Sequence, residues 1–281
     1  MKRTGKLLTT AALIALGVAG ITVNGPATAG IASTKHNLSS TGTGTNKFSG
    51  TQAICVFCHT PHGADTSAAV PLWNRILSSP SSYTTYDSLG TSTIDGEIAP
   101  VGSVSIACLS CHDGTQAMNV MINAPGSGGY DPVSGTTLPG SWTGPASSAS
   151  PAGSLNYATP SIVNIGTDLT NDHPIGIQYG GGGIDSTNPT GTTKDPDFNT
   201  TDLQHAIING KDIWWVDTPI GTGGTREKTD IQLYTRNDFS GGNPEPSVEC
   251  ASCHNPHTSD NPTFLRIANT GSAVCLACHV K

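Results

Sequence analysis

All eight cysteines of the chain lie in Cys-x-x-Cys-His motifs, and this feature constrains the fold more than any other. The four motifs are Cys55/Cys58/His59, Cys108/Cys111/His112, Cys250/Cys253/His254 and Cys275/Cys278/His279. On a helical turn, residues i, i+3 and i+4 share one face, so two thiols and one imidazole can meet the same planar group. We therefore expect four covalently attached c-type haems, each with two cysteine anchors and the motif histidine as the proximal iron ligand.

Structural disulfides and zinc sites are the competing interpretations of these cysteines. Disulfides are common in exported proteins, and paired Cys-x-x-Cys motifs can bind zinc. Neither chemistry requires a histidine directly after every second cysteine, so both explain the pattern less well than haem does.

The N-terminus has the features of a secretory signal peptide. Three cations at Lys2, Arg3 and Lys6 precede an apolar run from Leu7 to about residue 23, and a small-residue cleavage site follows. We expect residues 1–29 to be removed and the rest to be exported without membrane insertion; a membrane anchor is the alternative. Of the 13 basic residues three lie in this leader, so about ten remain against 20 acidic ones, which disfavours nucleic acid and anionic membranes as partners.

The composition predicts a fold organised around cofactors. The chain has 34 glycines and 19 prolines, and only 5% of its residues are aromatic, so side chains alone would form a poor core. We expect residues 30–281 to form one domain of mostly irregular chain around the haems, with short helices at the motifs. Residues 113–249 would be a haem-free insert rich in glycine, serine and threonine.

A few short elements are expected between the motifs. The segments "DIWWVD" and "DIQLYTR" (212–217 and 230–236) indicate a small β-hairpin. A short helix is expected from Pro71 in "SAAVPLWNRIL", and another around His205 in "DLQHAIING". The run Gly180–Gly183 is interpreted as a flexible linker.

Five further histidines could supply the second axial ligand of the four irons: His36, His62, His173, His205 and His257. His62 and His257 each follow a motif histidine by three residues, across a proline. So short a segment cannot round the edge of the same porphyrin, so each of these histidines either faces solvent or binds the iron of a different haem. Asp172 could orient His173. His205 is the expected spare, and Met118 and Met121 are interpreted as packing residues rather than ligands.

A set of short motifs resembles the multihaem c-type cytochromes of metal-reducing bacteria. These are "KHNLSS", "CVFCHTPHG", "PLWNR", "CLSCHDGT", "NDHPIG", "CASCHNPH" and "CLACH". With four haem motifs, the chain is most similar to the extracellular tetrahaem cytochromes of the OmcE type, which polymerise into conductive filaments. The resemblance implies stacked bis-histidine haems with His36, His62, His173 and His257 as distal ligands, one of them donated by a neighbouring subunit.

Three functions follow from this sequence. The first is electron transfer along an extracellular or cell-surface filament of head-to-tail copies, with His36 as a candidate donor to the next copy and other cytochromes or extracellular acceptors as partners. The second is a discrete periplasmic or surface electron shuttle. The third, a multihaem reductase, would need an open iron position, whereas here the candidate distal ligands outnumber the irons.

Overall fold

The computed structural model describes residues 30–159 and 161–280; the expected signal peptide, residues 1–29, lies outside the described residues. Its helices are short, namely α1 (Ser105–His112), α2 (Cys250–Cys253) and α3 (Ala273–Cys278). The strands are β1 (Lys47–Phe48), β2 (Val120–Met121), β3 (Thr136–Thr137), β4 (Trp142–Thr143), β5 (Ile177–Gln178), β6 (Leu203–Ile208), β7 (Lys211–Val216), β8 (Ile231–Arg236) and β9 (Glu245–Val248).

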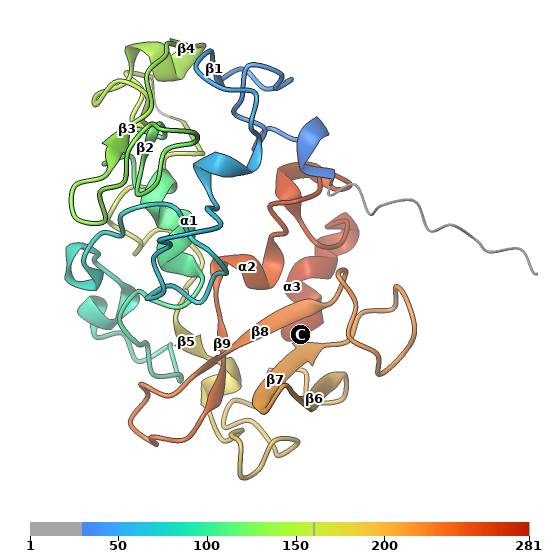
Figure 1. Ribbon diagram of the computed structural model, residues 1–281. Coiled ribbons are helices and arrows are strands. Elements are labelled where there is room, and N and C mark those ends of the chain that lie inside the picture. Colours follow the sequence, from blue (N-terminus) through green and yellow to red (C-terminus); the bar gives the residue numbers. More distant parts are fainter. Residues whose placement is uncertain (1–29, 160, 281) are drawn as a thin grey trace, which may run out of the picture.

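The largest regular element is a five-stranded antiparallel sheet with the strand order β5-β9-β8-β7-β6. The expected pairing of β7 with β8 is present, with Trp214 opposite Leu233 and Val216 opposite Ile231. The hairpin is therefore part of a larger sheet, and this sheet is formed by the insert. β9 ends directly before the third motif, so the sheet leads the chain into that motif (Figure 1).

The segment around His205 is a strand, so the expected helix is wrong there. β6 pairs with β7 along its whole length, from Leu203 opposite Val216 to Ile208 opposite Lys211. The turn between them is Asn209-Gly210, and both residues have positive φ, 51° and 72°. Asn-Gly with this backbone is the preferred two-residue turn of a β-hairpin, and it specifies the pairing more strongly than the alternative helical pattern.

The expected helix from Pro71 is also absent, because this segment pairs with the first haem motif instead. Trp73 forms an antiparallel bridge with His59, and the Thr60 N–H donates to the Leu72 carbonyl over 2.9 Å. Leu72 has a φ of 57°, which no α-helix allows. The partner of this segment lies more than ten residues earlier in the chain, so its local pattern is not informative.

The run Gly180–Gly183 is a packed turn rather than a flexible linker. Gly180, Gly181 and Gly182 are buried, Gly183 is exposed, and all four have positive φ. A Cβ atom on Gly180 would lie 2.1 Å from Cγ2 of Thr193. Glycine is therefore required at this position by both the backbone conformation and the close approach of residue 193.

Apolar side chains form separate small clusters, one on the sheet and others beside the first two motifs. The sheet cluster includes the fully buried Trp214 and Val216. Ile106 and Leu109 of α1 pack with Trp73 in a second cluster. Met121 and Met118 lie in two further clusters and are 0% and 2% exposed, in keeping with their interpretation as packing residues.

Candidate haem-attachment site

Each Cys-x-x-Cys-His motif begins on a short helical segment, which is a 3-10 turn at Cys55–Phe57 for the first motif and an α-helix for the other three. The second motif occupies the C-terminal half of α1. In the other three, the N–H of the histidine donates to the carbonyl of the first cysteine, as in His59 to Cys55 over 2.8 Å and His279 to Cys275 over 2.9 Å. All eight cysteines are free thiols, so none is used in a disulfide.

The thiols of successive motifs are neighbours. Cys58 of the first motif interacts electrostatically with Cys111 of the second. Cys108 of the second is hydrogen-bonded to Cys250 of the third, and Cys253 of the third lies near Cys278 of the fourth. Burial raises the pKa of Cys58 to about 12, so this thiol is neutral, as a thioether would be. The motifs thus follow one another through the molecule in sequence order.

Ser105 and Glu249 hold the second and third motifs together at the starts of their helices. The Ser105 hydroxyl donates to the Glu249 carboxylate and accepts from the Cys250 N–H over 2.9 Å. Glu249 also forms a capping box with Ser252 at the start of α2. Its carboxylate is buried and pairs with Arg236 over 3.2 Å, which compensates the charge. Burial nevertheless raises the pKa of Glu249.

The imidazoles of three motif histidines are oriented by backbone carbonyls. Nδ1 of His59 lies 2.8 Å from the Pro71 carbonyl. Nδ1 of His112 lies 2.7 Å from that of Val163, and Nδ1 of His254 lies 2.7 Å from that of Thr263. A carbonyl can only accept, so Nδ1 carries the proton and Nε2 presents its lone pair, which is the tautomer that binds a metal.

Four of the five remaining histidines have Nε2 free of protein hydrogen bonds within the described part of the chain, and His205 does not. Nε2 of His205 is 2.9 Å from Asp212, and its ring packs on Trp214. His173 is exposed and its Nδ1 contacts the Pro174 carbonyl at 2.9 Å. The His173 ring is therefore oriented by the Pro174 carbonyl, and not by Asp172 as the sequence suggested.

His36 is held in place by residues that follow the third motif, and its ring lies beside His112 of the second motif. Its Nδ1 is 3.2 Å from the Pro256 carbonyl, and its ring stacks on Phe264 at 4.4 Å. In Figure 1 the blue turn at residues 30–33 correspondingly lies beside the red segments around α2 and α3. Burial, reinforced by His112, lowers the pKa of His36 to about 4, so the ring is neutral at neutral pH. A metal-binding imidazole must be neutral.

Two of these histidines lie beside a motif histidine at a ring-centre distance suited to one iron between them. The ring centres of His59 and His257 are 6.3 Å apart with an interplanar angle of 18°. Those of His112 and His36 are 6.1 Å apart at 65°. Two metal–nitrogen bonds of about 2.0 Å, with about 1.1 Å from each nitrogen to its ring centre, require about 6.2 Å. The donors present therefore fit haem with two axial imidazoles.

The other two candidates remain on the surface. His62 and His173 are exposed, and neither ring forms a ring contact with another imidazole of the described residues. His62 is fixed through its backbone, because its carbonyl accepts from Asn123 over 2.9 Å. The structure thus brings His36 and His257 to motif histidines and leaves His62 and His173 facing outward.

The first and third motifs belong to a structural repeat that sequence reasoning recognised only in part. Asn74 donates from its backbone N–H to Cys58 and from its side chain to Val56, over 2.9 and 2.7 Å. Arg266 makes the equivalent bonds to Cys253 and Ala251, over 2.9 and 3.0 Å. Leu265 bridges His254 as Trp73 bridges His59. The connecting loops differ by three residues, which hides the repeat from a comparison at fixed spacing.

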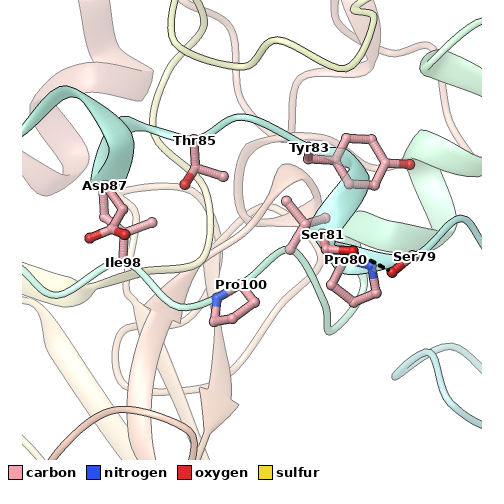
Figure 2. Close-up of a pocket in the computed structure, with 9 residues that line it drawn as sticks. Ser79, Pro80, Ser81, Tyr83, Thr85, Asp87, Ile98 and Pro100 are labelled. Carbon is pink, nitrogen blue, oxygen red and sulfur yellow. Dashed lines mark hydrogen bonds between the residues drawn. The ribbon is translucent and has the colours of Figure 1, made fainter.

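The depression drawn in Figure 2 is separate from these groups. It has a volume of about 490 Å³ and is lined by Ser79, Pro80, Ser81, Tyr83, Thr85, Asp87, Ile98, Pro100 and Val101. Cysteine and histidine are absent from this lining, so it offers haem neither an anchor nor a ligand.

Comparison with known proteins supports the cofactor. A protein-family model described as "Doubled CXXCH motif" matches residues 244–281, which contain the third and fourth motifs. No curated protein matches the chain. No helix within residues 30–159 and 161–280 is long and apolar enough to cross a bilayer. The motifs indicate covalently bound haem c, and the doubled motif is consistent with a multihaem c-type cytochrome that transfers electrons.

Proposed function

We propose that the chain is an exported tetrahaem c-type cytochrome that carries electrons through closely spaced bis-histidine haems and assembles with copies of itself into an extracellular filament. A haem iron supplies one-electron chemistry, alternating between the ferric and ferrous states. The protein's part is to anchor each haem, hold two neutral imidazoles toward its iron and set the distance to the next motif.

The two facing imidazole pairs are the observation that carries this proposal. His257 would be the distal ligand at the first motif and His36 the distal ligand at the second, because the ring-centre distances of 6.3 and 6.1 Å are close to the separation of about 6.2 Å that one iron needs. An iron held between two imidazoles has no open position for a substrate, which favours electron transfer over a reductase.

The contacts between thiols of successive motifs support a continuous electron path. Cys58 with Cys111, Cys108 with Cys250 and Cys253 with Cys278 join the four motifs in order. These thiols would anchor the four haems, so neighbouring thiols place successive attachment points close together. We therefore propose that electrons pass from motif to motif in sequence order.

His62 and His173 support assembly with a second copy. Both are exposed, and both would be available to an iron of a neighbouring chain. The expectation that His36 is the ligand donated in trans is replaced here, because His36 faces His112 of its own chain at 6.1 Å. A head-to-tail contact that donates one histidine to the next chain does not close on itself, so it generates a filament.

A discrete periplasmic or surface shuttle is the second candidate. It would use the same two imidazole pairs, with His62 and His173 moving to irons of their own chain. The signal-peptide pattern agrees with export in both cases, while an extracellular location belongs to the filament alone.

The test is purification of the native holoprotein, followed by haem quantitation, electron paramagnetic resonance and negative-stain imaging. We expect four haems per chain, all low-spin, and polymers. Fewer than four haems, or a high-spin ferric signal in the polymer, would overturn the tetrahaem bis-histidine proposal. Monomers alone at high concentration, with four low-spin haems, would replace the filament by the shuttle.

A further inference from the structure

Arg75 is a completely buried cation, and every hydrogen bond of its guanidinium goes to a backbone carbonyl. It is 0% exposed. Its Nε and Nη2 donate to the Ser110 carbonyl over 3.3 and 2.9 Å, and Nη2 also donates to Ala117 over 3.3 Å. Nη1 donates to Met118 and Val120 over 3.1 and 2.9 Å. All five N–H groups of the guanidinium are therefore occupied by neutral oxygens.

The position of Arg75 is between the first and second haem motifs. The preceding residue, Asn74, donates its N–H to the carbonyl of Cys58. Ser110, which receives two bonds from Arg75, lies between Cys108 and Cys111. One dipeptide thus bonds to the backbones of both motifs. Arg75 also interacts electrostatically with a thiol of each motif. Burial raises the pKa of Cys58 and of Cys111, and the positive charge of Arg75 opposes that rise.

The charge of Arg75 is not neutralised by an ion pair. No carboxylate of the described residues lies within 4.0 Å of its nitrogens, whereas the other strongly buried arginine, Arg236, pairs with Glu249 and Asp238. The nearby buried carboxylate of Asp113 is bound instead by Ser78, Tyr83 and Thr115. In the repeat around the third motif, the residue that follows the equivalent of Asn74 is Ile267, which is buried and apolar.

We propose that Arg75 is a fixed positive charge that raises the reduction potentials of the haems at the first and second motifs. This inference rests on the proposed function. Reduction adds one electron to a ferric haem and lowers its charge by one. A buried cation therefore favours the reduced form, and it does so strongly because the interior screens charge weakly. At the third motif the equivalent position is occupied by Ile267, and the nearby cation is Arg266, which is only partly buried and donates to the Ala251 carbonyl over 3.0 Å.

The test is spectroelectrochemical titration of the purified holoprotein in three variants. Arg75→Met removes the charge, and Arg75→Lys keeps a charge but loses the planar fork. Arg226→Met removes the same charge from an exposed site, where solvent screens it. In Arg75→Met we expect two of the four one-electron steps to become about tenfold less favourable, which is about 59 mV each. Both controls should keep those steps within half of that shift.

A purely structural role for Arg75 predicts a different result. Losing the five hydrogen bonds would then perturb Arg75→Lys as much as Arg75→Met, and equal shifts in both would overturn the inference. If Arg75→Met cannot be purified, Asp113→Asn should shift a reduction potential in the opposite direction. Removing this carboxylate should raise the potential of one step. An unchanged potential would count against charge tuning. Haem content and spin state are measured on the same samples. Four low-spin haems with unmoved potentials would reject this inference alone, whereas missing haems would reject the proposed function.

Discussion

Replacing His257 by alanine tests the assignment of distal ligands most directly. The ring of His257 is exposed, makes no hydrogen bond within the described part of the chain, and lies 6.3 Å from that of His59. Removing it should leave the fold and the cysteine anchors intact and open one coordination position at the first motif. We expect four attached haems per chain, with about a quarter of the ferric iron converted from low-spin to high-spin.

The matched control is His205→Ala. His205 is also an imidazole outside the motifs, but its Nε2 is 2.9 Å from Asp212 and is not available to iron. This change should cost about 1 kcal/mol of the free energy of unfolding and leave every iron low-spin. Quantitative electron paramagnetic resonance of the ferric protein distinguishes the two variants. Combining His36→Ala with His257→Ala should convert about half of the iron, because the two rings serve different motifs.

Two outcomes would refute this reasoning. If His257→Ala remains fully low-spin, the 6.3 Å separation does not report a shared iron. If His205→Ala produces the high-spin signal instead, the hydrogen bond to Asp212 does not prevent His205 from binding iron, and His205 is not the spare histidine. Mass spectrometry of both variants verifies that all four haems remain attached, so loss of a ligand is not confused with loss of a haem.

Two further predictions concern the scaffold. Gly180→Ala and Gly90→Ala both place a side chain at a φ of 57°, but only the first meets an atom within 4 Å. Chemical denaturation should show that Gly90→Ala lowers the free energy of unfolding by about 1 kcal/mol, through backbone strain alone. Gly180→Ala should lower it clearly more, because the clash adds to strain of about 1–3 kcal/mol. Equal losses in the two variants would contradict a packed turn. Hydrogen bonds, first that from the Thr187 hydroxyl and then that from Asn243, lower the pKa of Asp185 to about 2. Because this folded-state pKa lies below the unfolded value of about 3.9, the stabilisation is complete above pH 4 and is lost as the pH falls toward 2. Asp185→Asn should flatten the dependence of stability on pH in that interval, and parallel curves would exclude this contribution.

Local patterns predicted the elements whose partners are close in the chain. The cysteine and histidine spacing is itself a helical pattern, and the strands 211–216 and 231–236 are rich in β-branched and aromatic residues. The Asn209-Gly210 turn is also a local feature, but the segment around His205 was interpreted as a helix, and that interpretation was wrong. These are cases in which the determining interactions lie within one or two turns of chain.

The rest depends on partners far apart in sequence. The Pro71 segment is extended because it pairs with His59, and Gly180 is buried because residue 193 packs against it. His36 is ordered by the Pro256 carbonyl, 220 residues later. No local pattern contains these partners, so the Pro71 segment was expected to be helical and the glycine run to be flexible.

The two CHxPH segments have the same sequence pattern but different contacts in the structure. His62 and His257 occupy equivalent places in the repeat, yet His257 faces His59 while His62 is exposed. A two-fold relation between the units would make the pairing reciprocal, with His62 opposite His254. Among the described residues, no ring contact joins these two. The two units therefore differ in their contacts, because among the described residues His62 lacks the imidazole neighbour that His257 has.

This asymmetry predicts a difference between His62→Ala and His257→Ala in the native polymer. If His62 binds an iron of the next chain, His62→Ala should keep four haems per chain and abolish polymers in negative-stain images. His257→Ala acts within one chain and should still polymerise. His173→Ala is the parallel variant, since His173 is equally exposed. Polymers of normal length from both His62→Ala and His173→Ala would show that neither exposed histidine connects the chains, and the assignment of the ligand donated between chains would then be wrong.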